Sequence, residues 1–304
     1  MNTRKRSYKI FRMTALGILT IVVFSVAIIT SYQYLRVTLA APYTPASMPL
    51  NLEIVGSGDK DLVFIHGLTG SKNYWKRDLD AISGTHKLLL VDLLGFGDSP
   101  KPYSDYSLEM QVGALEAIIS KEGFDGGRTV LVSHSMGTVI ALALLEKHPD
   151  WFKGAIAIGT PVYKDMKEFN DIMSEHSLFD RLTANKYSKY LCLLHPIFMT
   201  RIFKPDNLSD DVFADANKHT WQSYYNSLNE IILDTDLYAI ARNIGNKKVV
   251  FIHGDQDTTA PLVNAVKLAN TVSNAEFLTV NGGDHQLFLK DPNIVWKAVT
   301  DFFG

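Results

Sequence analysis

Apolar residues follow two different patterns along the chain. Residues 13–30 form an uninterrupted stretch of eighteen residues without a charge, in which three Thr and one Ser are the only polar side chains. From about residue 51 onward, short apolar runs rich in β-branched residues alternate with longer amphipathic stretches. That alternation is typical of strands connected by helices in a mostly parallel sheet. The chain therefore predicts one long apolar helix followed by an α/β domain.

Six of the short runs are predicted to be strands, and several are apolar throughout, as expected of strands that are covered on both faces. The predicted strands are 62–66, 87–92, 129–133, 155–158, 248–253 and 276–280. The most clearly helical stretches are 107–121, 136–147, 261–271 and 292–303. No internal repeat interrupts this order.

The alternation stops between residues 160 and 246. Only helical pieces rich in aromatic residues and Lys occur there, and they hold twelve of the chain's aromatic residues. We interpret the segment as a helical cap inserted between two strands. Its aromatic residues fit a cover over an apolar cleft as well as they fit the core of the insertion itself.

The apolar run 13–30 is long enough to cross a bilayer. At about 1.5 Å per residue it spans ~27 Å, close to the ~30 Å of the hydrocarbon layer. Tyr32 and Tyr34 follow at the level that aromatic rings prefer, and Arg36 ends the segment. The charges in front of the run are all positive: Arg4, Lys5, Arg6, Lys9 and Arg12. The positive-inside rule keeps them in the cytoplasm and places the sequence after Arg36 across the membrane.

An uncleaved signal anchor and a cleavable signal peptide both fit this segment, whereas a buried core helix fits it poorly. The run exceeds the about 7–15 apolar residues of a signal peptide, and residues 38–40 are a weak cleavage site. We expect a cytoplasmic flank and anchor over 1–36 and an extended, proline-containing tether over 37–50. The globular domain then covers 51–304 on the extracytoplasmic side, and cleavage would make it a secreted domain.

Composition and charge exclude several classes of protein. The 30 Lys and Arg against 32 Asp and Glu give a net charge of −2, so nothing indicates binding to nucleic acid. An apolar fraction of 46% with 20% charged residues excludes a disordered chain. Cys192 is the single cysteine, which rules out an intramolecular disulfide and a cysteine metal cluster.

The motif Ser-His-Ser-Met-Gly at 133–137 lies between a predicted strand and a predicted helix. This is the context of a nucleophile elbow, a sharp turn that lifts the central hydroxyl, here that of Ser135, off the sheet edge. Ser133 stands where Gly is usual. By itself Ser135 could be only a helix N-cap, but the partners that nucleophilic catalysis requires follow in the sequence.

From about Leu50 to Gly304 the chain resembles the α/β-hydrolase family, on five motifs in register. Besides the elbow, His-Gly-Leu at 66–68 resembles the oxyanion loop, and 92–99 resembles the loop after the next strand. Residues 253–257 with Pro261 resemble the loop of the triad acid, and 282–285 resemble the loop of the triad histidine. The resemblance implies a mostly parallel central sheet with helices on both faces and a helical cap.

A base must take the proton of a serine nucleophile, and histidine titrates in the right range. His285 lies in a Gly-rich loop between a strand and the last helix, at the sheet edge where Ser135 is expected. His66 and His253 end strands beside glycine, and we expect them to brace loops. His134 is expected to point away from the reaction centre.

Three carboxylates compete to orient His285. The family pattern Gly-Asp-x-Asp-x-x-x-Pro, placed on residues 254–261, favours Asp257 as the acid and gives Asp255 a role in shaping the loop. Asp284 is a weaker candidate because a carboxylate cannot easily reach the ring of the next residue. The resemblance also implies that the backbone N–H groups of Leu68 and Met136 form the oxyanion hole.

These features predict a serine hydrolase that cleaves carboxylic esters of lipids or other apolar acyl substrates through Ser135, His285 and Asp257. Serine at position 135 argues against haloalkane dehalogenase and epoxide hydrolase chemistry, which in this family uses a carboxylate nucleophile. The alternatives are a carbon–carbon bond hydrolase, a peptidase or an acyltransferase of the same fold, and a non-catalytic binding protein. No cofactor or metal is implied, and the expected partners are a small ester or lipid substrate and, through the N-terminal helix, the membrane.

Overall fold

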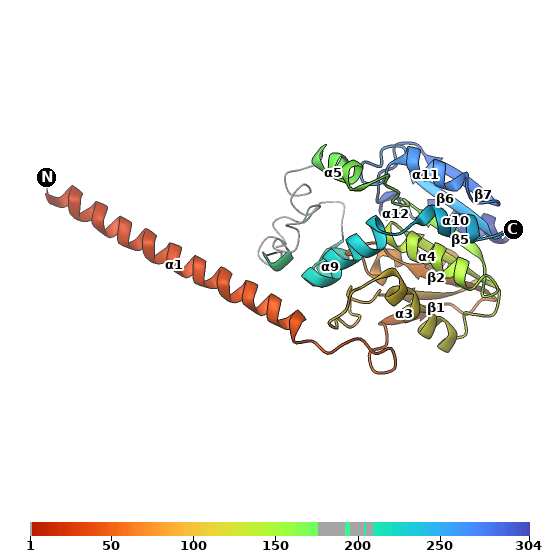
Figure 1. The fold of residues 1–304 in the computed structure, drawn as a ribbon, viewed down its shortest axis with the longest axis horizontal. Coiled ribbons are helices and arrows are strands. Elements are labelled where there is room, and N and C mark those ends of the chain that lie inside the picture. The colour runs from red at the N-terminus through yellow and green to blue at the C-terminus, as the bar shows by residue number, and fades with distance from the viewer. Residues whose placement is uncertain (1, 176–191, 195–203, 205–208) are drawn as a thin grey trace.

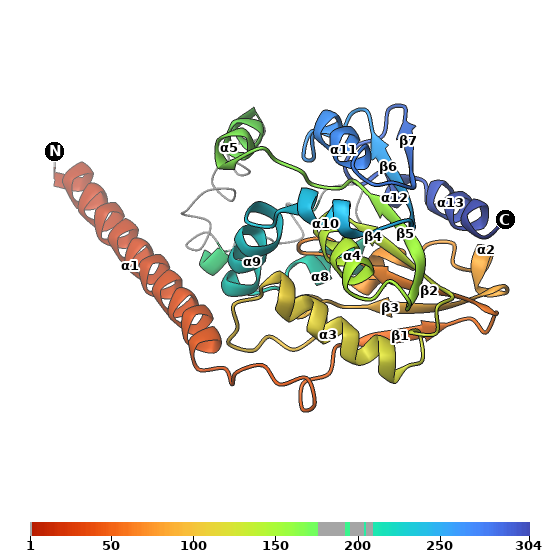
Figure 2. The same cartoon turned by 45° about the vertical axis from the view of Figure 1, so that its right-hand side comes forward.

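The computed structural model describes residues 2–175, 192–194, 204 and 209–304. A long N-terminal helix extends away from the remainder of the chain, which folds around one central sheet (Figures 1 and 2).

Seven strands form the sheet in the order β1-β3-β2-β4-β5-β6-β7, and all neighbours are parallel except β1, which is antiparallel to β3. The strands are β1 (Leu52–Val55), β2 (Lys60–Ile65), β3 (His86–Val91), β4 (Thr129–His134), β5 (Phe152–Ile158), β6 (Lys248–Gly254) and β7 (Ala275–Val280). Each of the six predicted strands overlaps one of these. The sequence pattern does not predict β1, because this strand is short, lies at the sheet edge and includes the charged Glu53.

Helices cover both faces of the sheet, as predicted. In β2, Val63 and Ile65 point to one face and Leu62 and Phe64 to the other, since successive side chains of a strand alternate. The first face packs against α3 (Leu108–Lys121), α4 (Met136–Lys147), α10 (Leu237–Asn243) and α11 (Leu262–Ala269). The second packs against η1 (Lys72–Trp75), α2 (Asp80–Ser83), α12 (Leu287–Lys290) and α13 (Asn293–Phe303).

Between β5 and β6 the described residues form helices and contain no strand, in agreement with the predicted helical insertion. These are α5 (Met166–Glu175), α8 (Asp210–Ala216), α9 (Trp221–Ser227), the π-helical turn η3 (Leu228–Leu233) and α10. Residues 192–194 are also helical, and the rest of 176–208 apart from residue 204 lies outside the described residues. Helix α10 packs on the sheet beside α4 and so belongs to the sheet layer, not to the insertion that covers it. From here on, the cap means the described residues from 166 to 233.

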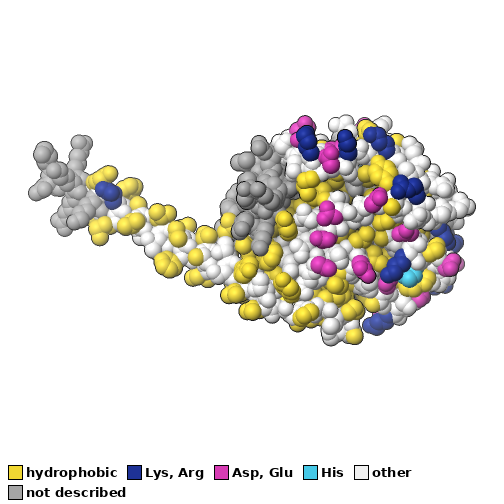
Figure 3. All heavy atoms as spheres, in the orientation of Figure 1, with side chains coloured by type: hydrophobic (Ala, Val, Ile, Leu, Met, Phe, Trp, Pro, Cys, Tyr) yellow, Lys and Arg dark blue, Asp and Glu magenta, His cyan; other side chains and the backbone are white. Residues whose placement is uncertain are grey.

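The N-terminal helix α1 (Asn2–Thr38) is much longer than the predicted apolar run. Within it, Ile10–Thr38 is a candidate membrane span by length and composition, and an 18-residue window inside it has a mean hydropathy of 2.4. Figure 3 shows hydrophobic side chains along this helix and on the adjoining surface of the globular part. Residues 37 and 38, predicted to begin the tether, belong to α1.

The chain between α1 and β1 contacts the globular part near its beginning and at its end. The amide of Tyr103 donates to the carbonyl of Ala41 at 3.1 Å, and Pro42 forms an isolated β-bridge with Tyr103. Leu50 is buried in the core, and Tyr43 packs against it. The predicted tether is therefore docked at several points.

Candidate active site

Ser135 lies at the turn between β4 and α4, in a backbone conformation that is rare for a residue with a side chain. Its φ is 52° and its ψ is −125°. The amide of Ser135 donates to the carbonyl of Ile158 at 2.9 Å, and the Thr138 hydroxyl donates to the carbonyl of Ser135 at 2.7 Å. Strained residues of this kind persist only where the surroundings hold them, and they concentrate at functional sites.

Two glycines allow other backbone segments to approach this turn. A Cβ on Gly137 would lie 2.5 Å from the carbonyl oxygen of Ile65, and a Cβ on Gly67 would lie 2.8 Å from the Cβ of Ser135. Ser133, which occupies the usual glycine position, is accommodated because its hydroxyl donates to the carbonyl of Ile156 in β5 at 3.1 Å. Serine in place of the usual glycine thus leaves no buried hydroxyl without a hydrogen-bond partner.

The structure brings Ser135, His285 and Asp257 together in one chain of hydrogen bonds. The Ser135 Oγ lies 3.0 Å from the His285 Nε2, and the His285 Nδ1 donates to the Asp257 Oδ2 at 2.8 Å. Ser135 follows β4, Asp257 follows β6 and His285 follows β7, so the three residues meet at the carboxyl edge of the sheet. Parallel strands place their carboxyl ends at one edge, which is where ligands bind in open α/β sheets.

The Asp257 carboxylate is fully buried. Its Oδ1 accepts hydrogen bonds from the amides of Thr259 at 2.9 Å and Ala260 at 2.8 Å. Burial alone would raise the pKa of Asp257, but the hydrogen bond and charge of His285 together with the Ala260 amide outweigh it, so this pKa lies below its ordinary value.

The two competing carboxylates point elsewhere. Asp255 accepts a hydrogen bond from the amide of Gly282 at 2.7 Å, so it ties the loop after β6 to the loop after β7. Asp284 accepts from the amide of Gln286 at 3.1 Å and from the Lys290 ammonium at 2.5 Å.

The residues expected to supply oxyanion donors flank Ser135. Met136 is the first residue of α4 and is fully buried, and Leu68 follows Gly67 in the loop after β2. Within the described part of the chain, the amides of Leu68 and Met136 have no hydrogen-bond acceptor.

His134 does not point away from the centre, contrary to the expectation from sequence. Its Nε2 donates to the carbonyl of His285 at 2.8 Å, and the two rings lie 4.8 Å apart. Burial, followed by the neighbouring charge of His285, lowers the pKa of His134 to about 3. The ring is neutral and supports the loop that carries His285.

His66 and His253 contact loops, as expected. The His66 Nε2 accepts a hydrogen bond from the Leu93 amide at 2.9 Å, which joins the loops after β2 and β3. The His253 Nε2 donates to the carbonyl of Ala260 at 2.9 Å within the loop of Asp257. Burial lowers the pKa of both histidines.

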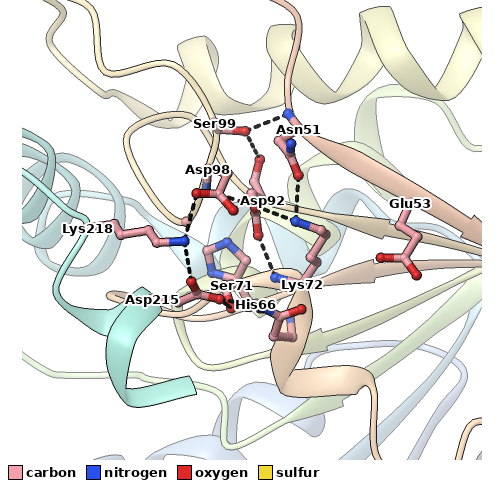
Figure 4. Close-up of polar contacts among 12 residues, drawn as sticks. Asn51, Glu53, His66, Ser71, Lys72, Asp92, Asp98, Ser99, Asp215 and Lys218 are labelled. Atoms are coloured by element: carbon pink, nitrogen blue, oxygen red, sulfur yellow. Dashed lines mark hydrogen bonds and ion pairs between the residues drawn. The ribbon is translucent and has the colours of Figure 1, made fainter. Parts of the chain in front are cut away.

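A polar network that the sequence does not reveal connects the cap to the loops beside this site (Figure 4). Asp215 in α8, which is 5% exposed, accepts hydrogen bonds from the Ser71 hydroxyl at 2.7 Å and the Asn73 side chain at 2.6 Å. The Lys218 ammonium bridges Asp215 at 2.6 Å and Asp98 at 2.7 Å. We call these five residues the cap clasp.

A second buried carboxylate, that of Asp92, binds the same loops. Asp92 accepts from the Lys72 amide at 2.7 Å, the Lys72 ammonium at 3.0 Å and the Asp98 amide at 2.9 Å. Gly97 must approach it closely, since a Cβ there would lie 2.4 Å from the Asp92 carboxyl carbon. The start of η1, directly after the oxyanion loop, is thus held by Asp92 on one side and by the cap clasp on the other.

A hollow of about 370 Å³ adjoins the acid loop, lined by Ile172, Glu175, Asp257, Thr258 and Pro261. Among the described residues, no cluster of His, Cys, Asp and Glu side chains is arranged to hold a metal ion.

Comparison with known proteins gives a family match over most of the chain. Residues 61–292 match the family model described as alpha/beta hydrolase fold. Among curated proteins, a probable lysophospholipase of Arabidopsis thaliana, BODYGUARD 1, is 26% identical over 281 residues, which cover 79% of this chain. The match spans 60% of that relative's own length.

Solved structures share the fold at low sequence identity. A bromoperoxidase from Bacillus anthracis has a TM-score of 0.67 at 20% identity and covers 87% of this chain and 99% of its own. An E-2-(acetamidomethylene)succinate hydrolase has a TM-score of 0.66 at 21% identity and covers 87% of this chain and 98% of its own.

Proposed function

The chain belongs to the α/β-hydrolase family, and on this premise we propose that it is a serine hydrolase that cleaves carboxylic esters of lipids or other apolar acyl substrates. The observation that carries the proposal is the continuous set of hydrogen bonds from Ser135 through His285 to the buried Asp257. Its strained serine, ring and carboxylate match the arrangement that activates a hydroxyl for acyl transfer.

In the acylation step, the Ser135 Oγ attacks the ester carbonyl carbon while His285 Nε2 takes its proton. Asp257 holds the ring in the tautomer with a proton on Nδ1 and stabilises the imidazolium that forms. The tetrahedral oxyanion accepts hydrogen bonds from the amides of Leu68 and Met136, and the start of α4 adds the positive end of its dipole. His285 then protonates the departing alcohol.

Deacylation repeats these steps with water. His285 takes a proton from the water as it attacks the acyl-enzyme, the oxyanion forms in the same place, and the proton returns to the Ser135 Oγ as the acid leaves. Each oxyanion donor lowers the barrier by about 3 kcal/mol, by comparison with oxyanion-hole variants elsewhere.

Two features support an apolar, lipid-like substrate. The domain is joined to a candidate membrane span, Ile10–Thr38, and the cap contains buried aromatic and aliphatic residues, among them Phe169, Trp221 and Leu228. The curated relative named a probable lysophospholipase is consistent with such a substrate. In this proposal residues 1–36 are a cytoplasmic flank and uncleaved anchor, 37–50 a connector, and 51–304 the catalytic domain on the extracytoplasmic side.

Labelling with a fluorophosphonate probe tests the proposal directly. We expect the full-length protein to be labelled, Ser135→Ala to be unlabelled, and Ser120→Ala, at the exposed end of α3, to be labelled like the wild type. Absence of labelling in the wild type, or labelling that persists in Ser135→Ala, would overturn the proposal. Hydrolysis of p-nitrophenyl esters of graded chain length then defines the acyl group, and we expect the medium and long chains to be preferred.

A further inference from the structure

The end of α1 is packed onto the cap. The ring of Tyr34 stacks on Trp221, the first residue of α9, with ring centroids 6.0 Å apart and planes 9° from parallel. Val37, which is 2% exposed, forms a small apolar cluster with Cys192, Leu193 and Trp221. The membrane-span candidate and the cap are therefore in direct contact within the last five residues of the helix.

Burial along α1 is confined to one end and largely to one side of the helix. Among the side chains of α1 that the structure describes, the buried or half-buried ones all lie in its C-terminal half: Val26, Ile29, Thr30, Gln33, Val37 and Thr38. Most of them recur at intervals of three and four residues, which places them on one side of a helix. The opposite side, with Leu35 and Tyr32, stays exposed.

The connector after α1 holds the same junction from a second point. Ala41 and Pro42 are paired with Tyr103 through a backbone hydrogen bond and a β-bridge. Ser104, the next residue, is held by α9, because its carbonyl accepts from the Asn226 side chain at 3.3 Å. The end of α1, the connector and the cap are thus linked by direct contacts, and the connector is not a free tether.

The length of α1 places this junction at the membrane surface. A hydrocarbon layer of ~30 Å takes about 20 residues of helix at about 1.5 Å each. If the basic residues up to Arg12 stay on the cytoplasmic side, the layer extends to about residue 32. Tyr34, Arg36 and Val37 then lie at headgroup depth on the far side, and so does Trp221, which touches Tyr34.

We propose that the cap rests in the headgroup layer of the extracytoplasmic leaflet, on a docking surface formed by Tyr34, Arg36, Leu39 and Tyr103, with the buried Trp221 packed directly behind Tyr34. The partner is the lipid bilayer itself. Leu39 and Tyr103 expose 79% and 50% of their surface, and the Arg36 side chain is also exposed, which suits contact with lipid carbonyl and phosphate groups. An aromatic pair at this depth, Tyr34 with Trp221, matches the aromatic belts that position proteins at membrane interfaces.

The consequence for catalysis rests on the proposed function. A cap held against the leaflet places the covered edge of the sheet next to lipid, so the substrates of Ser135 are lipids resident in the bilayer rather than esters dissolved in water. Because the site is then held at a fixed, short distance from the leaflet, the effective concentration of such substrates at the site also rises.

Tryptophan quenching tests the docking surface without any assay of activity. The full-length protein is reconstituted in phosphatidylcholine vesicles with and without lipids brominated near the headgroup end of the acyl chain. We expect quenching in the wild type, most of which is lost in Trp221→Phe. Trp151→Phe is the matched control, because Trp151 stacks on His148 at the opposite edge of the sheet and should leave the quenching unchanged.

Equal quenching in the wild type and Trp221→Phe would overturn the proposal. Crosslinking between copies through this face, without lipid quenching, would overturn it in favour of a dimer interface.

A second experiment separates docking from catalysis. A variant with Tyr34→Ala, Val37→Ser and a flexible Gly-Ser insertion after Leu39 releases the cap from α1 while it keeps the catalytic residues. We expect hydrolysis of a monoacyl phospholipid in vesicles to fall several-fold and hydrolysis of a soluble short-chain ester to be unchanged; Leu16→Ala, on the exposed surface of α1, should change neither.

An unchanged ratio of the two rates would refute the link between docking and substrate. A wild type that cleaves neither substrate would refute the proposed function and leave the quenching result standing.

Discussion

Replacing Asp215 with Ala should slow catalysis although this residue does not touch the reacting atoms. Its carboxylate holds Ser71 and Asn73, which directly follow the loop of the proposed oxyanion donor Leu68. Within that loop Thr69 has a φ of 60°, a conformation that a β-branched residue adopts only under constraint. Such strain amounts to about 1–3 kcal/mol, so the loop relaxes when one of its two attachments is removed.

The structure sets the size of the effect. The Ser71 hydroxyl is fully buried and loses its acceptor, which costs about 1–3 kcal/mol. The loss at Asn73 is smaller because this residue is only half-buried, and Lys218 retains its ion pair with Asp98. We expect a stability loss of about 2–4 kcal/mol from these unpaired donors. Displacement of one oxyanion donor would add a fall in kcat of roughly 10- to 100-fold, which corresponds to about 1.4–2.7 kcal/mol of transition-state stabilisation.

The assay measures kcat and KM for a soluble p-nitrophenyl ester, together with the thermal midpoint of the detergent-solubilised protein. We expect a lower kcat and a nearly constant KM for Asp215→Ala, and a smaller effect for Asp215→Asn, which keeps one acceptor oxygen. Asp211→Ala, on the exposed side of the same helix, is the control and should behave as the wild type. A lower midpoint with an unchanged kcat would show that Asp215 only stabilises the fold, and would refute the role in positioning the loop.

Three further predictions concern the buried charges and rings of the site. Asp257→Asn should lower kcat by several orders of magnitude with little change in KM, measured on the same ester, because the amide stabilises the wrong tautomer of His285. Gly97→Ala should reduce the free energy of unfolding by about 3–5 kcal/mol, because its Cβ would displace Asp92 from its buried ion pair; thermal or urea unfolding measures this loss. His134 stays neutral in the folded protein until about pH 3, whereas an unfolded histidine binds a proton below about pH 6.5, so folding stability falls as the pH drops between these values, by at most about 1.4 kcal/mol per pH unit. His134→Phe should weaken this pH dependence in unfolding curves recorded at pH 7.5 and pH 5.

Each of the three has an outcome that contradicts it. Near-normal kcat in Asp257→Asn would remove that residue from the mechanism. Gly126→Ala, where an added Cβ meets no atom within 4 Å, is the control for Gly97→Ala, and equal stability of the two variants would refute the steric argument. A pH dependence that is the same with and without His134 would show that other groups titrate in this range.

The strands and the turn at Ser135 could be predicted because their signals are local. Strands buried on both faces, such as β4 and β6, are short continuous runs of apolar residues, and the elbow lies between one such run and a helix. The edge strand β1 has no comparable signal, since its residues are half-exposed and its pairing with β3 depends on a segment some 35 residues away. Element bounds shifted by a few residues because caps and hydrogen bonds, rather than hydrophobicity, decide where an element ends.

The orientation of His134 illustrates a limit of motif reasoning. The five-residue motif states that a histidine precedes Ser135 but contains nothing about the loop after β7, which supplies the carbonyl that His134 binds. Its ring direction follows from packing against Phe288 and His285, two residues about 150 positions away. Side-chain direction at a turn is thus a property of the assembled sheet edge.

The sequence by itself determined the family, the central sheet, the long apolar helix and the positions of Ser135, Asp257 and His285 as candidates, because each is written in a periodicity or a short motif. Only the tertiary structure decided which carboxylate reaches His285, that Asp215 holds Ser71 across 144 positions, and that α1 packs on the cap instead of leading into a free tether. The physical reason is that hydrogen bonds and ring contacts act over a few ångströms in space. Segments far apart along the chain leave no trace of such contacts in their own sequence until the fold brings them together.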